Sequence, residues 1–276
     1  MTKYEKIMLR VEKIMLRVKE HYEDVKKKIP EDRIIGIFLE GSQNYRMDLP
    51  DSDVDTKVFI FPSIDDIIYN KEPLSTTWIR ENNEHISVKD IRLVFNTFRK
   101  QNLNFVEVLF TMYYILNPKY GYFWKKLAYN RDDIARYNEF VAVMAMCGVA
   151  QNKYKMIFKP SEATEKSIEK FGYAPKQLHH LKRIEYFLET YMSEESYISC
   201  MRPPLEVARE LVEIKVGKYN NIEAKVIADE ALNHINIIRQ NVINHANIYS
   251  NINLDAEKIL NQVQKDLMLE YLRKEV

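Results

Sequence analysis

Residues 40–55 read Glu40-Gly-Ser-Gln-Asn-Tyr-Arg-Met-Asp-Leu-Pro-Asp-Ser-Asp-Val-Asp55 and lie between two apolar runs. The first run, residues 33–39 (Arg-Ile-Ile-Gly-Ile-Phe-Leu), predicts a buried strand that leads to Gly41. The second run, residues 54–61, predicts another strand, which Pro62 closes. Between them, residues 50–53 (Pro-Asp-Ser-Asp) are typical of a turn. The sequence therefore predicts two strands joined by a polar connection that begins with Gly-Ser and ends with Asp-x-Asp.

The Asp-x-Asp motif places two carboxylates at the start of the second predicted strand. Side chains alternate along a strand, so Asp53 and Asp55 are expected on one face of the sheet, where a divalent cation would relieve their repulsion. Mg²⁺ prefers oxygen ligands that it shares with phosphates and water. Gly41 has no Cβ to block a phosphate, and Ser42 can bind one through its hydroxyl and backbone. Either motif alone is common, and Asp-x-Asp alone is more often a turn cap; together they predict a metal and polyphosphate site.

Composition indicates a globular protein without a general affinity for polyanions. The chain has 276 residues, 46% of them hydrophobic, and a net charge of +1. A charge so close to zero provides no long-range attraction to nucleic acid or to anionic membranes. The two cysteines suit a reducing cytoplasm, and the N-terminus lacks a signal-peptide pattern. The apolar run 140–150 is too short to cross a bilayer and predicts a buried helix, so we expect a cytoplasmic protein with no membrane partner.

The remaining pattern predicts three segments. Residues 5–11 (Glu-Lys-Ile-Met-Leu-Arg-Val) recur as residues 12–18, which predicts an amphipathic N-terminal helix within residues 1–30. Residues 31–130 are expected to form an α/β (α+β) domain with a small mixed sheet, to which residues 84–88 contribute a candidate third strand. Residues 131–276 are expected to form an all-helical domain, with helices over 132–158, 174–192, 204–216, 221–247 and 254–274.

The motifs resemble those of a known superfamily. Gly41-Ser42-x-x-Tyr45 and Pro50-x-Ser52-Asp53-x-Asp55 are similar to the signature of the DNA polymerase beta-like nucleotidyltransferases, and more narrowly to their RlaP-like (YcgL-type) branch, some members of which are associated with RNA repair. The resemblance covers roughly residues 33–240. It continues through Asp90-Ile91-Arg92, through Asn102-x-x-x-x-Glu107-x-Leu109, and through Gly172-Tyr173-x-x-Lys176-x-x-x-His180-Leu181-x-Arg183.

The resemblance implies roles for individual residues. Asp53 and Asp55 would bind the metal, and a third carboxylate would come from a later strand. Spacing back from Asp90 places that carboxylate at about His85, so neighbouring Glu84 is the first candidate and Asp90 the second. The implied nucleotide contacts are Gly41, Ser42, Tyr45, Lys176, His180 and Arg183. Arg46 stands where the branch has glycine and could add a phosphate contact or be solvated; His180 could instead be a core histidine.

The implied activity is transfer of NMP from an NTP to a hydroxyl, with release of pyrophosphate and with Mg²⁺ or Mn²⁺ as cofactor. The acceptor could be an RNA end, a protein side chain or a small molecule. Two alternatives are a nucleotide-binding module without turnover and a toxin–antitoxin-type transferase that acts on a partner protein. The oligomeric state is left open.

Two patterns in the second half suggest RNA chemistry instead. Lys153, Lys155 and Lys159 alternate with Tyr154 and Phe158, a pattern that could grip single-stranded RNA by charge and stacking but is also ordinary for a helix C-terminus. Arg239 and His245 resemble the pair of HEPN-type ribonucleases, although such a spacing is common by chance.

Overall fold

The computed structural model describes residues 2–49 and 52–273, and these form two compact units. The first unit contains the described residues up to Asn44, those between Leu49 and Tyr137, and those from Asn253 onward. The second contains Tyr45–Asp48 and Asn138–Ile252. The second unit is helical throughout its secondary structure, so the expected fold class, a small mixed sheet with helices followed by a helical region, is confirmed.

The division differs from the expected domains. The N-terminal helix, residues 131–137 and the described residues from Asn253 onward all belong to the first unit, whereas the sequence predicts a separate N-terminal helix and one helical domain over 131–276. Tyr45–Asp48, which follow the Gly-Ser motif, belong to the second unit. These differences arise from contacts between residues far apart in sequence, which helical periodicity does not reveal.

The first unit is built on a five-stranded sheet in the order β3-β4-β2-β1-β5. β4 runs parallel to β2, and the other neighbouring pairs are antiparallel. The two strands predicted around the Gly-Ser connection are β1 and β2. The candidate third strand is β4, whereas β3 and β5 were not predicted, because β3 is a largely polar edge strand and β5 is very short. The strands are β1 (Ile34–Glu40), β2 (Asp55–Ile60), β3 (Ser75–Ile79), β4 (His85–Asp90) and β5 (Tyr114–Leu116).

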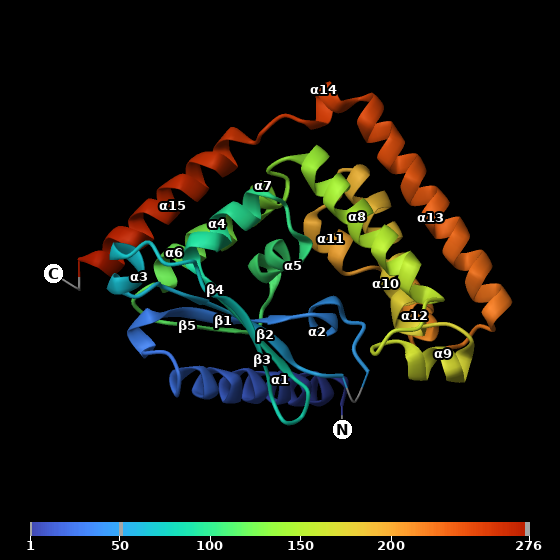
Figure 1. The fold of residues 1–276 in the computed structure, drawn as a ribbon, viewed down its shortest axis with the longest axis horizontal. Helices are drawn as coiled ribbons and strands as arrows, with labels where there is room; N and C mark the ends of the chain where they lie inside the picture. The colour runs from blue at the N-terminus through green and yellow to red at the C-terminus, as the bar shows by residue number, and fades with distance from the viewer. Residues whose placement is uncertain (1, 50–51, 274–276) are drawn as a thin grey trace. The chain divides into compact units, whose positions relative to one another are not determined.

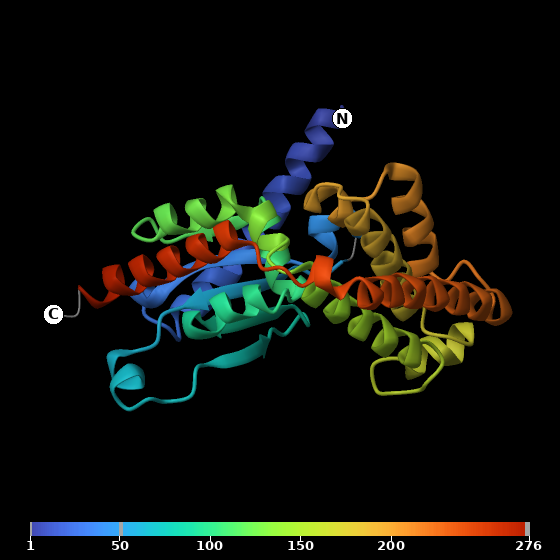
Figure 2. The same ribbon diagram turned by 90° about the horizontal axis from the view of Figure 1, so that it is seen from above.

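Helices cover both faces of this sheet, with α1 on one face and α4, α6 and α15 on the other (Figure 1). Seen from above, α15 runs beside α6 (Figure 2). The helices of this unit are α1 (Lys3–Lys26), α3 (Ile64–Ile68), α4 (Ile91–Arg99), α5 (Leu103–Val106), α6 (Gly121–Tyr129), α7 (Arg131–Ala135) and α15 (Leu254–Leu272), with α2 (Ser42–Tyr45) at its border and two 3-10 helices, η1 (Glu31–Arg33) and η2 (Glu107–Phe110).

The two faces have different cores. The α1 face is aliphatic: Ile14 and Val18 of the second repeat copy are 3% and 0% exposed and pack on Val58 and Ile86, while Ile7 of the first copy is 51% exposed. The second copy is therefore the more buried one, while the first contributes the partly buried Val11 to the same core. The other face is aromatic, with the rings of Phe38, Phe59 and Trp124 in contact. The Phe38 and Trp124 centroids lie 4.0 Å apart.

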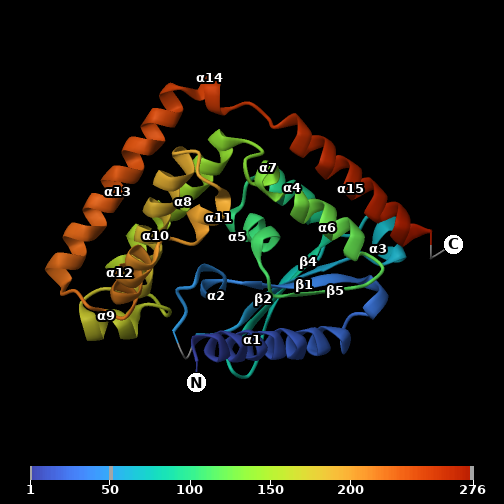
Figure 3. The same cartoon turned by 180° about the vertical axis from the view of Figure 1, so that it is seen from behind.

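In the second unit α10 is the central helix and packs against α8, α11, α12 and α13 (Figure 3). The expected helix 132–158 is two helices, since Asn138 interrupts it and caps α8 through a 2.9 Å bond from the Val141 N–H. The helices of this unit are α8 (Glu139–Ile157), α9 (Glu165–Phe171), α10 (Pro175–Met192), α11 (Tyr197–Met201), α12 (Leu205–Lys215), α13 (Asn221–Asn244) and α14 (Ala246–Tyr249).

The start of α13 provides a stability prediction. The Asn220 side chain accepts from the N–H groups of Ile222 and Glu223, and the Glu223 carboxylate accepts from the Asn220 N–H, which completes a capping box. We expect Asn220→Ala to lower the free energy of opening of α13 by about 1 kcal/mol, measured by hydrogen exchange of its amides. Asn236→Ala, at an exposed mid-helix position, is the control, and equal effects of both changes would refute the cap's contribution.

Candidate functional site

The register of β1 and β2 brings the two sequence motifs to one end of the sheet. Glu40, the last residue of β1, pairs with Asp55, the first residue of β2. The turn that begins at Gly41 and the Asp53–Asp55 segment therefore adjoin, as the order of strand, Gly-Ser, spacer, Asp-x-Asp and strand predicted. Gly41 has φ 87°, a left-handed conformation that glycine adopts without strain.

The connection between the motifs is described only in part, since Pro50 and Asp51 of the predicted turn lie outside the described residues. Its flanks bond to each other: the Ser52 N–H donates to the Leu49 carbonyl at 3.0 Å, and the Leu49 N–H donates to Ser52 Oγ at 2.7 Å. Asp53 then follows at an exposed position and Val54 at a buried one.

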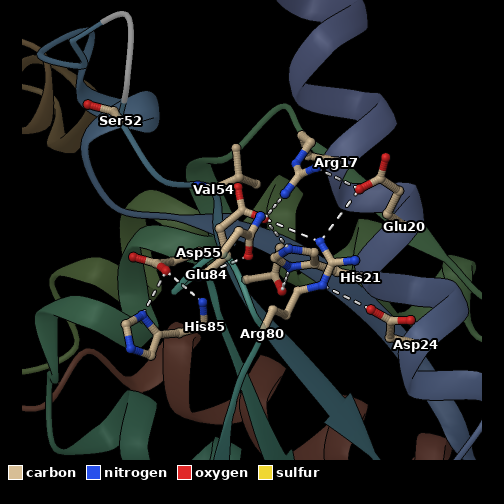
Figure 4. Close-up of polar contacts among 12 residues, drawn as sticks. Arg17, Glu20, His21, Asp24, Ser52, Val54, Asp55, Arg80, Glu84 and His85 are labelled. Atoms are coloured by element: carbon tan, nitrogen blue, oxygen red, sulfur yellow. Dashed lines mark hydrogen bonds and ion pairs between the residues drawn. The ribbon is translucent and has the colours of Figure 1, made fainter.

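His85 of β4 holds the Asp55 carboxylate. Its backbone N–H donates to Asp55 Oδ1 at 2.9 Å, and its ring Nδ1 lies 3.0 Å from the same oxygen (Figure 4). A carboxylate only accepts hydrogen bonds, so Nδ1 carries the proton in this contact. Both contacts use Oδ1. Among the described residues Asp55 Oδ2 and the Asp53 carboxylate have no hydrogen-bond partner, so both remain available to a cation.

Glu84 lies on the opposite face of the sheet from Asp55, so the structure does not bring the first-choice third carboxylate to the metal-binding pair. Its carboxylate faces α1, where it contacts Arg17 and His21 (Figure 4). His21 also bonds Thr56 Oγ1 at 2.8 Å, and Thr56 points away from the Asp55 face because successive strand side chains alternate. The residue of β4 that shares the Asp55 face is His85, one position later.

Glu84 is 6% exposed and has an unusually complete set of partners. Besides Arg17 and His21 it accepts from Asn82 Nδ2 at 2.9 Å and from the Val54 N–H at 3.1 Å, and Arg80 lies at 3.3 Å. Burial alone would raise the pKa of Glu84, but these hydrogen bonds outweigh it and lower the pKa from 4.5 to about 2. The carboxylate is therefore ionised and bound within the protein, which is unsuited to a metal ligand that must meet a substrate.

Asp90, the second choice, is at the wrong end of β4. The parallel register pairs it with Ile60, whereas Asp55 lies beside His85 at the other end of the strand. Asp90 caps α4 by accepting from the Arg92 N–H at 2.9 Å and forms an ion pair with the Arg92 guanidinium at 2.7 Å. The Asp90-Ile91-Arg92 motif therefore has a structural role as a helix cap.

The Gly-Ser turn is supported by residues that sequence reasoning had not assigned. The buried Glu107 accepts from the Gly41 N–H at 3.3 Å, so this N–H already has a partner. Asn44 donates to the Leu39 carbonyl at 2.8 Å and accepts from the Thr111 hydroxyl at 2.7 Å. The Asn102-to-Leu109 block was the available signal, because the resemblance included Glu107 without indicating its partner.

Tyr45 and Arg183, both expected at a nucleotide, are brought together in the second unit. The Arg183 guanidinium carbon lies 4.0 Å from the Tyr45 ring centroid, and both residues are buried. Arg46, next in the chain, is exposed and has φ 61°, a left-handed conformation that costs a residue with a Cβ about 1 kcal/mol or more. This conformation is consistent with glycine at that position in the resembled branch.

A cluster of basic side chains surrounds this pair on α8 and α10. Lys176 is exposed and His180 is partly buried, one helical turn apart, with Arg183 on the next turn. Burial lowers the pKa of Lys153 on α8, and the charges of Lys176 and Arg183 lower it further. Burial, followed by the charges of Arg183, His179, Lys153 and Lys176, lowers the pKa of His180 well below 6.5. Such mutual repulsion would be relieved by a bound anion.

His179, next to His180 on α10, is a fully buried histidine. It is 2% exposed, and its Nδ1 lies 2.8 Å from the Leu211 carbonyl. Burial lowers the pKa of His179 to about 4, while the Leu211 contact opposes that shift. His180 is partly buried beside these basic side chains, and its two expected roles, a nucleotide contact and a core histidine, stay predictions.

The residues of the two RNA patterns lie in the second unit, and the expected RNA contacts and ribonuclease pair stay predictions. The charges of Lys176 and Arg183 on α10 lower the pKa of Lys153. The Tyr154 hydroxyl instead forms 2.7 Å hydrogen bonds with Asp229 and Lys225 of α13. Arg239 and His245 are both exposed, six positions apart, and His245 ends α13 with its Nδ1 2.9 Å from the Asn241 carbonyl. Six positions do not return to the same helix face.

The donor chemistry at Asp53 and Asp55 fits a hard divalent cation. Mg²⁺ is commonly held by one or two carboxylates together with substrate phosphates and water, so two carboxylates with available oxygens are sufficient. A different group of three possible metal ligands lies on α10 and α13 of the described residues. Its members are Glu185, Glu189 and His234, whose ligand atoms lie within 4.8 Å of one another. The Asp53–Asp55 pair thus fits a cation shared with phosphate rather than a cage made by protein alone.

Comparison with known proteins provides little further evidence. No protein family matches the sequence, and no curated relative matches it either. Among solved structures, the fold is similar to a nucleotidyltransferase-like protein from Exiguobacterium sibiricum, at 11% sequence identity and a TM-score of 0.29, over 91% of this chain and 80% of that one. A likeness this remote carries no weight in assigning an activity. Among the described residues, no helix has both the length and the apolar character of a membrane span.

Proposed function

We propose that this protein is a metal-dependent nucleotidyltransferase, which transfers NMP from an NTP to a hydroxyl acceptor. The observation that carries the proposal is the pairing of Glu40 with Asp55, because it sets the Gly-Ser turn beside two carboxylates with available oxygens. Few chemistries need a small-residue turn and paired hard ligands at one sheet end, and polyphosphate binding with a divalent cation is one that needs both.

In the proposed reaction an acceptor hydroxyl oxygen bonds to the α-phosphorus of the NTP. The bond from that phosphorus to the oxygen bridging to the β-phosphate breaks, pyrophosphate leaves, and the hydroxyl proton passes to solvent. Asp53 and Asp55 would hold Mg²⁺ or Mn²⁺, which would neutralise phosphate charge and favour ionisation of the hydroxyl. The Ser42 hydroxyl donates to a phosphate oxygen, and Gly41 allows close approach.

The basic cluster of Lys153, Lys176, His180 and Arg183 is proposed as the phosphate-binding part of the second unit. Its support is electrostatic, since the charges of Lys176 and Arg183 lower the pKa values of Lys153 and His180 beyond the effect of burial. The planar guanidinium of Arg183, held on the Tyr45 ring, suits an oxygen-rich anion.

The direct test is incubation with each of the four NTPs, labelled at the α-phosphate, with Mg²⁺ or Mn²⁺ and a panel of acceptors. The panel contains RNA with a free 3′ end, hydroxyl-bearing side chains of proteins, and aminoglycosides. We expect pyrophosphate release and label transfer, both lost in the Asp53→Asn/Asp55→Asn variant. Nucleotide binding without release across the panel would favour the binding-module alternative, and label on a co-purifying protein would favour the toxin–antitoxin-type transferase.

The basic cluster provides a separate binding prediction. Lys176→Ala is expected to weaken NTP binding about tenfold, since one charged contact to phosphate contributes about 1.5 kcal/mol. The matched control is Lys166→Ala, which removes an exposed lysine of α9 in the same unit. Isothermal titration with NTP and Mg²⁺ measures both, and equal affinities for the two variants would remove Lys176 from the proposed site.

A further inference from the structure

We propose that Glu84 and His85 are positioning residues that fix the Asp53-Val54-Asp55 segment from the two faces of the sheet and so set its affinity for the cation. The inference rests on the proposed function, because it concerns the same metal site. Neither residue is assigned to bind metal or substrate; both act through contacts with the segment that does.

The segment needs such support because only its last residue, Asp55, is paired in the sheet, with Glu40 of β1. β2 begins at Asp55, and its pairing with β4 begins at Thr56. Val54 is 4% exposed, so its N–H is removed from water, and the partner it finds is Glu84 Oε1 at 3.1 Å. An unpaired buried N–H is costly, so this contact stabilises the backbone between the two aspartates in its observed conformation.

Because side chains alternate along a strand, Glu84 and His85 contact the segment from opposite faces of the sheet. Glu84 approaches Val54 from the α1 face, and Arg17, His21, Asn82 and Arg80 hold its carboxylate in place (Figure 4). His85 approaches from the other face and directs two donors at a single oxygen, Asp55 Oδ1. A carboxylate held through one oxygen presents the other in a fixed direction, which is how hydrogen-bonded neighbours commonly raise the affinity of a metal ligand.

Variants can separate positioning from simple stabilisation. Glu84→Gln keeps an oxygen that can accept from the Val54 N–H but loses the charge that pairs with Arg17 and Arg80. Glu84→Ala loses both. His85→Asn keeps a side-chain donor near the place of Nδ1, and His85→Ala removes it. The control, Asp24→Ala, breaks the 2.9 Å ion pair of Arg80 without touching Glu84.

Mn²⁺ affinity in the presence of NTP, followed by electron paramagnetic resonance of free Mn²⁺, is the measurement. We expect Glu84→Ala and His85→Ala to weaken Mn²⁺ binding about 10-fold or more, the usual effect of removing such a neighbour. Glu84→Gln and His85→Asn are expected to restore most of the affinity, even though Glu84→Gln lowers the unfolding temperature. Asp24→Ala is expected to bind as the wild type does.

Wild-type affinity in both alanine variants, with the Asp53→Asn/Asp55→Asn variant inactive in binding, would overturn the positioning role and leave the proposed function standing. Wild-type affinity in the double asparagine variant would remove the metal site and with it both proposals. If Glu84→Ala does not fold, the alanine and asparagine variants of the partly exposed His85 still test the positioning role.

Discussion

Replacing Asp53 and Asp55 together by asparagine is expected to weaken Mn²⁺-dependent NTP binding at least about 100-fold, or about 2.7 kcal/mol. Asparagine has nearly the same shape but no charge, and a hard cation beside polyphosphate requires anionic oxygen ligands. The fold is expected to survive, because an asparagine at position 55 still accepts from the His85 N–H and Asp53 is exposed. Isothermal titration with Mn²⁺ and NTP measures the affinity.

The matched control for that experiment removes two charges elsewhere in the first unit. Asp132 and Asp133 are adjacent and exposed at the start of α7, and their double asparagine variant should bind as the wild type does. A loss of similar size in both double variants would show that net charge, rather than the Asp-x-Asp site, governs binding.

Glu84 is expected to make the first unit sensitive to acid. Its folded pKa is about 2, against 4.5 for the free side chain, so an ionised Glu84 stabilises the fold above about pH 4.5. As the pH falls from about 4.5 to about 2, about 3 kcal/mol of the free energy of unfolding is lost. His21 acts in the same direction: its folded pKa lies below 6.5, so acid protonates the unfolded state first.

Tryptophan fluorescence reports on the first unit, because both tryptophans, Trp78 and Trp124, lie there. Urea unfolding at a series of pH values from 7 to 3 should show stability decreasing with acid in the wild type. In Glu84→Gln the dependence below about pH 4.5 should flatten, while Glu81→Gln, at an exposed position, should follow the wild type. Parallel curves for all three proteins would contradict the role of Glu84.

Much of the first unit could be predicted from apolar runs. The strands around the Gly-Ser connection follow from residues 33–39 and 54–61, and their antiparallel pairing follows from the connection between them. β3 could not be predicted in the same way. It reads Ser-Thr-Thr-Trp-Ile and lies at the sheet edge. Its half-buried face holds only Thr76 and Trp78, and Ile79 is exposed, so the sequence shows no clear apolar alternation.

The candidate site was only partly predictable, because side-chain direction depends on register. Spacing indicated the neighbourhood of residues 84 and 85, but a shift of one residue exchanges the faces of the sheet. Glu84 is the first candidate for the third carboxylate because of its residue type. The register of β4 instead places His85 on the same face of the sheet as Asp55. Chemistry alone could not reveal that Glu84 already has a buried set of partners on α1.

Long-range contacts explain the remaining omissions. The helical spacing of Lys176, His180 and Arg183 indicated a basic row on one helix, but Lys153 joins it from α8 and Tyr45 from the segment after the Gly-Ser motif. Glu107 reaches Gly41 across a large separation in sequence. Periodicity describes one element at a time, so it identifies the faces of helices and not their partners.

The most direct test of the central claim is the anomalous signal of Mn²⁺ in crystals of the protein soaked with Mn²⁺ and an NTP. The account predicts a peak coordinated by the carboxylates of Asp53 and Asp55 and by phosphate oxygens of the nucleotide. A peak at Glu185, Glu189 and His234 instead, or an ordered nucleotide with no metal at Asp53 and Asp55, would contradict it.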